Sequence, residues 1–368
     1  MINYIFYPFL ASLDNVLRRY PGLSLEYLLE SGSSTVRENA LAILESIVSG
    51  EKILEFEASS EDYVLIYYSI LVGVKAIGDK KLMHRIALTY SKRAREKLDK
   101  ESVENLITIS KALGLDVRFL SESVKIPLKI VKSDVVFIEK PFAIPLKTYL
   151  KIVAGRLSQD PKYSLVNQVV SNGLVYVDRG VLIRILEERI YRFIMDSFEK
   201  IDFDTAKVTG FVNEIKRILD KYGWYKASVD LEFKTSYFVK DALPPCINRL
   251  IERLLGGENL SHHERFAVAS FLVSIGLGVE QVLEFFKHTP DFKEKIARYQ
   301  IEHIAGLRGS RKKYLPYNCE TMKSLGLCSI AEYCYTNVKN PLSVYKLNLK
   351  RIKSGSGNGE GEVNKHSI

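Results

Sequence analysis

Four cysteines occur in this chain of 368 residues, and all of them lie in its last third. They are Cys246, Cys319, Cys328 and Cys334, spaced as C-x72-C, C-x8-C and C-x5-C. Four thiolates form one complete ligand set for a single metal centre. No pair has the short spacing, about two to four residues, that seats two zinc ligands on one turn. Ligands from separate loops suit a larger group, so the spacing favours an iron–sulfur cluster.

Other uses of the four thiols stay open on spacing alone. They could bind zinc, form two disulfides, or serve as small core residues. The first 22 residues have no basic segment before the apolar stretch and no small-residue cleavage site, so they do not resemble a secretion signal. We therefore expect a cytoplasmic protein, and disulfides are rare in that compartment.

The composition indicates a large apolar core and a basic surface. Hydrophobic residues make up 46% of the chain, and no apolar run reaches the roughly 18 residues that span a membrane. Lysine and arginine number 53 against 44 aspartates and glutamates, which gives a formal net charge of +9. This excess favours a polyanionic partner such as nucleic acid.

The apolar periodicity predicts a mainly α fold. Apolar residues recur at three- and four-residue spacing over residues 34–48 and 80–98, which is typical of bundle helices. Short β-branched runs, among them 174–177 after the turn signal Ser171-Asn172-Gly173, predict a small α/β insert at about residues 120–180. We expect residues 1–220 to form a helical N-terminal domain that contains this insert.

The rest of the chain predicts a second helical domain. Its periodic segments are shorter, and the four cysteines lie among them. We expect residues 221–353 to form this C-terminal domain. Residues 354–368 contain almost no apolar side chains and predict a disordered tail.

Familiar catalytic motifs are absent. The sequence contains no G-x-x-x-x-G-K-[ST] phosphate loop and no G-x-S-x-G elbow. Asp202 and Asp204 could form the paired carboxylates of a two-metal site, but Asp204 precedes a helical segment and is equally a helix N-cap. We favour the structural role, so the sequence predicts no catalytic residue.

Basic and planar side chains gather in the sequence around the cysteines. They are His262, Arg265, His303, Arg308, Arg311, Lys312 and Lys313. Arginine and lysine neutralise phosphates, and histidine hydrogen-bonds to ribose and triphosphate oxygens or stacks on bases. The pattern favours a face that binds nucleotides or nucleic acid. A solvated charged surface with His303 in the core fits equally well.

The same region resembles a known family. Blocks between Cys246 and Pro341, among them ENLSHHERFAVASFL, RYQIEHIAG and YLPYNCETMKSLGLC, are similar to the iron–sulfur domain of the archaeal-type DNA primase large subunit. They occur in the family's order and cover about a quarter of the chain. The helical N-terminal part with its insert is similar to that family's N-terminal domain.

The resemblance implies a noncatalytic regulatory subunit of a heteromeric primase. Such a subunit stabilises and modulates a small catalytic subunit and promotes initiation of RNA primers on a DNA template during replication. The four cysteines fall on the family's ligands for a [4Fe-4S] cluster. His262 and Arg265 match positions that contact the primer 5′-triphosphate and the template. The segment after His303 that contains Arg308, Arg311, Lys312 and Lys313, which we call the basic loop, matches such a position as well.

The implied partners are the small catalytic subunit, template DNA, the RNA primer, the initiating nucleoside triphosphate and a further primase subunit. The N-terminal domain is expected to bind the catalytic subunit. Ile144, Tyr149, Tyr163 and Tyr176 are candidates for that contact, although aromatic residues at such spacing are more often core residues.

Two competing interpretations remain. In one, the chain is an independent iron–sulfur nuclease or nucleotidyl transferase that uses Asp202 and Asp204, and the isolated chain turns over substrate with a metal. In the other, it is a zinc- or cluster-stapled nucleic-acid-binding protein without a primase partner, and its DNA binding is strongly salt-dependent.

Overall fold

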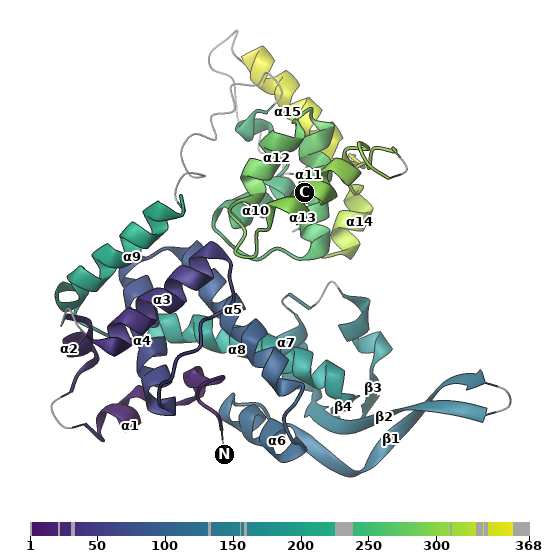
Figure 1. Ribbon diagram of the computed structural model, residues 1–368. Coiled ribbons are helices and arrows are strands. Elements are labelled where there is room, and N and C mark those ends of the chain that lie inside the picture. Colours follow the sequence, from purple (N-terminus) through teal and green to yellow (C-terminus); the bar gives the residue numbers. More distant parts are fainter. Residues whose placement is uncertain are drawn as a thin grey trace, which may run out of the picture. The chain divides into compact units, whose positions relative to one another are not determined.

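The computed structural model describes residues 2–20, 23–30, 34–131, 134–154, 156–157, 160–224, 238–309, 311–328, 334 and 338–355. These residues are mainly helical, with one small antiparallel sheet (Figure 1), as the periodicity predicted. Residues Met1–Lys226 and Ala227–Ile368 form two compact units, each with its own hydrophobic core.

Nine α-helices are described in the first unit. They are α1 (Leu13–Leu17), α2 (Leu25–Glu30), α3 (Thr35–Ser49), α4 (Ser60–Ile77), α5 (Lys80–Leu98), α6 (Val103–Ala112), α7 (Leu146–Val153), α8 (Arg179–Lys200) and α9 (Thr209–Lys221). Short 3-10 helices lie at η1 (Pro8–Leu10), η2 (Pro161–Tyr163), η3 (Leu165–Asn167) and η4 (Thr205–Val208).

Helix α4 lies at the centre of this unit. It begins with a capping box, in which Ser59 Oγ accepts from the Asp62 amide and Asp62 Oδ2 accepts from the Ser59 amide. It ends at Gly78, whose φ of 75° is a left-handed conformation that glycine adopts without strain. Most residues between these ends are buried, because α3, α5, α8 and α9 all pack on α4.

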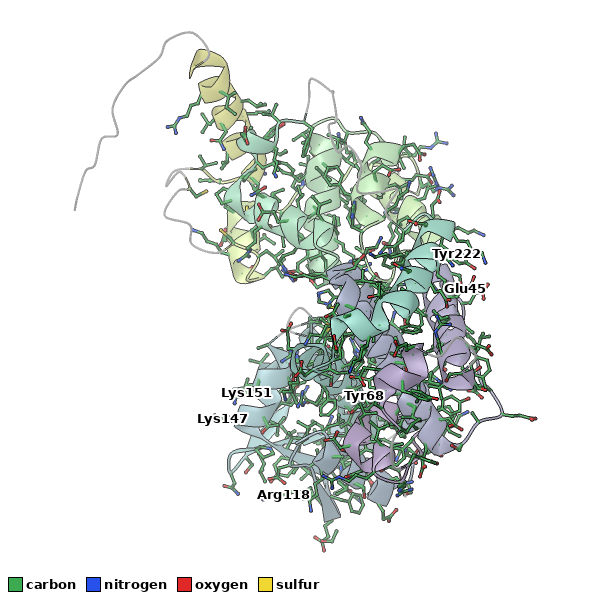
Figure 2. All side chains as sticks on the ribbon, turned by 90° about the vertical axis from the view of Figure 1, so that its left-hand side faces the viewer. Glu45, Tyr68, Arg118, Lys147, Lys151 and Tyr222 are labelled. Atoms are coloured by element: carbon green, nitrogen blue, oxygen red, sulfur yellow. The ribbon has the colours of Figure 1, made fainter. Side chains whose placement is uncertain are left out.

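Helix α9 is attached to the unit at both its middle and its end. At Gly73 of α4, an added Cβ would lie only 2.7 Å from Phe211 Cε1 of α9, so the missing side chain allows the two helices to approach closely. At the end of α9, Lys221 Nζ and Tyr222 Oη donate to Glu45 Oε1 of α3 at 2.6 and 3.0 Å. Figure 2 shows Glu45 and Tyr222 as neighbours at this surface.

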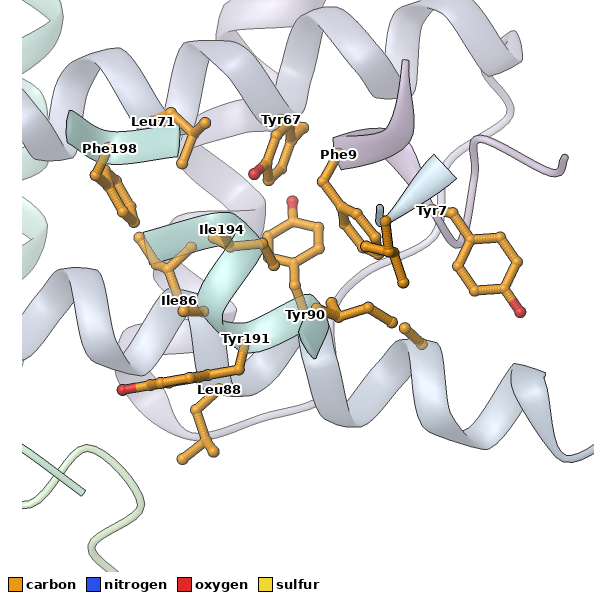
Figure 3. Packing of buried hydrophobic residues seen from close by; sticks show 14 of the residues in the cluster. Tyr7, Phe9, Tyr67, Leu71, Ile86, Leu88, Tyr90, Tyr191, Ile194 and Phe198 are labelled. Carbon is orange, nitrogen blue, oxygen red and sulfur yellow. The ribbon is translucent and has the colours of Figure 1, made fainter. Parts of the chain in front are cut away.

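Aromatic rings fill the core beside α4. Figure 3 shows Phe9, Tyr67 and Tyr90 close together, and the rings of Phe9 and Tyr90 meet Tyr67 edge to face at centroid distances of 6.3 and 5.2 Å. Edge-to-face contacts of this kind stabilise a core beyond the burial of apolar area. The packing therefore fixes η1, α4 and α5 against one another.

The sheet has the order β1-β2-β4-β3, with all pairs antiparallel. Its strands are β1 (Arg118–Val131), β2 (Asp134–Pro145), β3 (Val169–Ser171) and β4 (Leu174–Val177). Strands β3 and β4 are joined by Asn172 and Gly173, with φ values of 49° and 72°, which is the conformation of a two-residue type I′ hairpin turn. The turn signal in the sequence thus marked a real hairpin, whereas the β1–β2 hairpin is longer than the β-branched runs predicted.

The proposed docking residues of the insert are mostly core residues. Ile144 and Tyr149 are completely buried, Tyr163 is buried, and Tyr149 Oη donates to the Tyr163 carbonyl at 2.7 Å. Ile144 pairs with Val175 in the sheet, and both side chains belong to the core cluster. The prediction that Ile144, Tyr149 and Tyr163 contact the catalytic subunit is wrong, because the unit itself covers their side chains. Tyr176 is partly buried.

Two adjacent buried glutamates of α8 hold its neighbours, since Glu188 fixes α7 and the segment after it and Glu187 fixes α5. Glu188 is 1% exposed and accepts from Arg156 Nε at 2.9 Å and from Arg192 Nε at 3.2 Å. Arg192 also donates to the Lys151 and Ile152 carbonyls at the end of α7. Glu187 pairs in the same way with Arg95 and Arg184. Buried carboxylates are tolerated here because each has two guanidinium partners.

The second unit has six described α-helices and one 3-10 helix. They are η5 (Lys240–Ala242), α10 (Pro245–Leu255), α11 (His262–Ser274), α12 (Val279–Phe286), α13 (Glu294–Ile304), α14 (Cys319–Ser324) and α15 (Pro341–Gly355). Helix α11 is central, and α10, α12, α13 and α15 pack around its buried residues 267–273. Helix α15 continues to Gly355, into the segment predicted as a disordered tail, and residues 356–368 lie outside the described residues.

Candidate metal centre and nucleic-acid interface

The four cysteines belong to separate segments of the second unit. Cys246 lies in the first turn of α10 after two prolines and is buried, and Cys319 is the first residue of α14. Cys328 follows α14, where its amide donates to the Met322 carbonyl at 3.1 Å. Cys334 lies further along the chain and is partly buried. None of these four described residues forms a disulfide.

Hydrogen bonds to backbone carbonyls tie these segments together. Arg249 of α10 donates from Nη2 to the carbonyl of Leu327 at 2.8 Å, which joins the helix of Cys246 to the residue before Cys328. The Cys319 amide donates to the Lys339 carbonyl at 2.9 Å, which joins α14 to the segment that leads into α15. The polypeptide itself therefore joins the segments that carry Cys246, Cys319 and Cys328.

The thiols are close enough to interact electrostatically. Burial raises the pKa of the Cys246 thiol to about 12, and the negative charges of Cys328, Cys334 and Cys319 act in the same direction. Burial also raises the pKa of Cys319, with smaller contributions from Cys334 and Cys328 that Lys323 opposes. Neighbouring thiolates repel one another, and a bound cationic centre removes this cost because thiolate is the form that binds metals.

The four cysteines are a donor set of the kind that an iron–sulfur cluster uses, with each thiolate on a separate iron. A single zinc ion requires four ligands at about 2.3 Å from one point. Among the described residues, no group of three or more His, Cys, Asp or Glu side chains is arranged to hold a metal ion. Cys246, Cys319, Cys328 and Cys334 are the residues that would hold the cluster.

The N-terminus of α11 presents His262 to solvent. Ser261 Oγ accepts from the Glu264 amide and Glu264 Oε2 accepts from the Ser261 amide, so a capping box fixes the start of the helix. Arg253 of α10 also pairs with Glu264. His262, the first residue of the helix, is exposed and lies beside His263 with ring centroids 5.8 Å apart.

Arg265 is already engaged within the unit. Its guanidinium donates to the Leu260 carbonyl at 2.9 Å, to Asn259 and to Asp291 Oδ1 at 2.7 Å. The positive charge of Arg265 is therefore largely matched by Asp291. This arginine therefore joins the start of α11 to the segment before α13.

The basic loop after α13 is folded back on that helix. Gly306, with a φ of 76°, lies close to the backbone of Lys312 and Lys313. A Cβ added to Gly306 would be only 2.9 Å from the Lys313 nitrogen. Gly309, with a φ of 66°, lies equally close to His303 Nε2. Both positions require glycine because a side chain would meet a neighbour and strain the backbone.

The cations of this loop differ in their surroundings. Lys313 Nζ donates to the Val273 carbonyl at the end of α11, 3.1 Å away. Arg308 pairs with Glu302 and lies over the Tyr299 ring at 5.5 Å. Arg311 and Lys312 are exposed, and no ion pair involves them among the described residues. Of the predicted contact residues, these two and His262 are exposed, and their side chains make no hydrogen bond or ion pair among the described residues.

A row of rings joins His262 to the basic loop. We call it the aromatic row, and it consists of His262, His263, Tyr317, Phe266, Tyr314, His303 and Tyr299. Successive centroids in this order are 5.8, 6.0, 4.9, 6.0, 5.3 and 6.4 Å apart. Tyr317 Oη also lies 2.8 Å from His263 Nδ1.

The aromatic row brings together residues that the sequence listed separately. Tyr299 and Tyr314 are 54% and 39% exposed, so the row reaches the surface beside the basic loop. The sequence analysis missed Phe266, Tyr314 and Tyr317. The pair of tyrosines in Y-L-P-Y, directly after the basic loop, was the available signal.

Asp202 and Asp204 form no metal site in the described part of the chain. Asp204 Oδ1 accepts from the Ala206 amide at 3.0 Å and caps η4, as the structural interpretation predicted. No described helix combines the length and the apolar character needed to cross a bilayer.

Fold and site together define a mainly helical, two-unit protein with a small sheet in the first unit and gathered cysteines in the second. The family model for the N-terminal domain of the eukaryotic and archaeal DNA primase large subunit matches residues 6–206. The model for the C-terminal domain of the same subunit matches residues 236–358. The chain belongs to the family of DNA primase large subunits.

Individual relatives agree with this assignment. The DNA primase large subunit PriL of Thermoplasma acidophilum is 29% identical over 330 residues, which cover 87% of this chain and 89% of the relative. The PriL of Methanocella arvoryzae is 31% identical over 312 residues, or 84% and 78% of the two chains. The PriL of Methanopyrus kandleri is 50% identical over 103 residues, or 28% and 25%.

Membership of this family establishes the general function. The protein is a noncatalytic regulatory subunit of a heteromeric DNA primase, partnered with a small primase subunit, and it functions in DNA replication. The prediction made from the C-terminal blocks is confirmed. The interpretations as an independent nuclease or as a module without a primase partner do not hold.

Proposed function

We propose that the second unit binds a [4Fe-4S] cluster through Cys246, Cys319, Cys328 and Cys334. Beside it, the aromatic row and the basic loop hold template DNA and the 5′-triphosphate of the initiating nucleotide or RNA primer. The first unit binds the small catalytic subunit, and the complex acts in the cytoplasm.

The aromatic row is the observation that carries the nucleotide-binding proposal. Rings bind bases by stacking without regard to sequence, and cations beside them neutralise phosphates. The row provides both between His262 and the basic loop. Of the seven predicted contact residues, we assign His262, Arg311 and Lys312 to direct phosphate contact. The other four, Arg265, His303, Arg308 and Lys313, position the surface, because their side chains are already in contact with the unit itself.

Initiation is the step that such a surface promotes. Two free nucleotides must meet on a template without a duplex on which to stack, and most of the difficulty is the entropy of bringing them into register. A subunit that holds one of them by its triphosphate and base raises its effective concentration at the catalytic subunit. The cluster, when bound, links the segments of the four cysteines and so keeps this surface in shape.

The cluster is tested by metal analysis. Iron, sulfide and zinc are measured in anaerobically purified wild type, in Cys319→Ser and in Ser324→Ala, a control on the same helix. We expect about four irons and four sulfides per chain in wild type and in the control, and their loss in Cys319→Ser. One zinc and no iron in wild type would contradict the proposal.

Nucleotide binding is tested by comparing initiation with extension. His262→Ala and Lys312→Gln are assayed with the small subunit for dinucleotide formation, and for extension of a preformed primer that needs no initiating triphosphate. We expect the first activity to fall and the second to change little, with unchanged iron content. Equal loss of both activities would refute the assignment. Binding of the small subunit by a chain that ends at Lys226 tests the role of the first unit.

A further inference from the structure

Helix α15 carries exposed positive charges that lie outside the aromatic row and the basic loop. Pro341, Val344 and Tyr345 are buried against the unit. Lys346 and Lys350 lie on the opposite side and are exposed. We call these two residues, together with the exposed Lys339 just before the helix, the α15 cationic face.

No acidic residue accompanies this face in the sequence. The segment from residue 338 to residue 355, VKNPLSVYKLNLKRIKSG, contains five cations and no aspartate or glutamate. Three arginines elsewhere in the unit are matched by carboxylates, in the pairs Arg253–Glu264, Arg265–Asp291 and Arg298–Glu280. Among the described residues, no ion pair involves Lys346 or Lys350. Like charges four residues apart destabilise a helix, so the fold gains nothing from this arrangement.

The face is held rigidly to the cysteine-bearing part of the unit. Tyr345 Oη accepts from the Val239 amide at 2.8 Å, and Asn348 Nδ2 donates to the Ala242 carbonyl at 3.1 Å. Tyr345 also packs edge to face on Phe271 of α11, with centroids 5.7 Å apart. Since residues 238–242 lead directly into α10 and Cys246, the lysines keep fixed positions relative to the four thiols.

We infer that the α15 cationic face binds the phosphate backbone of single-stranded DNA as a second contact, separate from the aromatic row. Lysine ammonium groups are compact charges that attract phosphates without reading base sequence, and rigid placement lets several act together. Nucleic acid is the polyanion that fits a subunit working on a template. The inference rests on the proposed binding of template by the second unit.

The salt dependence of binding tests this contact. Binding of a fluorescent single-stranded DNA oligonucleotide is measured in the complex with the small subunit at several potassium chloride concentrations. The variant Lys346→Gln/Lys350→Gln removes two charges and keeps the aliphatic stems. For single strands, the logarithm of the binding constant changes with the logarithm of salt by about 0.7 per phosphate contacted. We expect the slope to fall by about 1.4 in this variant, with lower affinity at every salt concentration.

A matched control separates this contact from a general effect of net charge. Lys216→Gln/Lys287→Gln removes the same charge from α9 and from the residue that follows α12, and we expect the wild-type slope. An unchanged slope in the α15 variant would overturn the inference, as would an equal decrease in the control. Normal DNA binding with weaker binding of the small subunit would assign the face to a protein and also overturn it. If wild type itself does not bind the oligonucleotide, the proposed function fails first.

Discussion

Trp224, the only tryptophan in the chain, anchors the end of α9 and should stabilise the first unit measurably. Its indole Nε1 donates to Asp79 Oδ2 at 2.7 Å, and its amide donates to the Leu219 carbonyl at 2.9 Å. Lys81 lies over the ring at 4.2 Å and Arg85 at 5.6 Å. Asp79 has a second role, since its Oδ1 caps α5 through the Leu82 amide.

The substitution Trp224→Phe removes the donor and keeps an aromatic ring between the two cations. A hydrogen bond to a charged group contributes about 1.5–3 kcal/mol. The weaker attraction of a benzene ring for Lys81 and Arg85 adds a few tenths. We therefore expect the free energy of unfolding of the first unit to fall by about 2 kcal/mol, measured by urea unfolding followed by circular dichroism. Tyr222→Phe, which removes an exposed hydrogen bond to Glu45, is the control and should cost less than about 1 kcal/mol.

The fluorescence of Trp224 provides a second, independent measurement. Burial lowers the pKa of Lys81 from its ordinary 10.5 to about 8, Asp79 opposes this shift and Arg85 adds to it. Wild-type emission should therefore change with a midpoint near pH 8, and Lys81→Gln should abolish the change. The folded chain loses the Lys81 proton near pH 8, whereas the unfolded chain holds it up to the ordinary pKa of 10.5. The stability of wild type relative to Lys81→Gln should therefore rise between about pH 8 and pH 10.5.

Two results would refute this account of Trp224. One is a loss of less than 0.5 kcal/mol in Trp224→Phe, a value within the scatter of ordinary surface substitutions, roughly ±0.5 kcal/mol. The other is a pH-dependent emission change that persists in Lys81→Gln, because another group would then be responsible for it.

Three further predictions follow from close contacts and buried charge. Gly73→Val should lower the free energy of unfolding of the first unit by about 1–3 kcal/mol, because the added side chain forces α9 away from α4. Gly210→Ala is the control, since a Cβ there meets nothing within 4 Å, and it should not lower the stability. Urea unfolding measures both variants. Glu188→Ala should cost about 3–5 kcal/mol in the same assay, because it leaves buried guanidinium groups without their partner. Under the proposed function, Gly309→Ala should displace His303 and reduce primer initiation while iron content stays at the wild-type level; unchanged initiation would contradict the role of the loop.

Local features of the fold were predictable from the sequence. The hairpin at Asn172-Gly173 depends on residues within a few positions of each other, and it occurs where the turn signal indicated. The apolar periodicity likewise predicted the helices, because one turn of a helix brings only near neighbours together. The β1–β2 hairpin was underestimated because its pairing continues past β-bulges that no short window reveals.

The cysteines show what composition alone can establish about a site. Their number and their separation pointed to one centre with ligands from several loops, since ligand count is a property of the sequence. The order of the C-terminal blocks then indicated the family, which the family models confirm.

Only the tertiary structure decided which of the predicted residues remain available for binding. Arg265 and Lys313 resemble Arg311 and Lys312 in the sequence, but they are engaged by Asp291 and by the Val273 carbonyl, 26 and 40 positions away along the chain. The aromatic row depends in the same way on contacts between α11, α13 and the segment after the basic loop. Such pairings between distant residues are set by how helices pack, and a single sequence records the side chains without recording their partners.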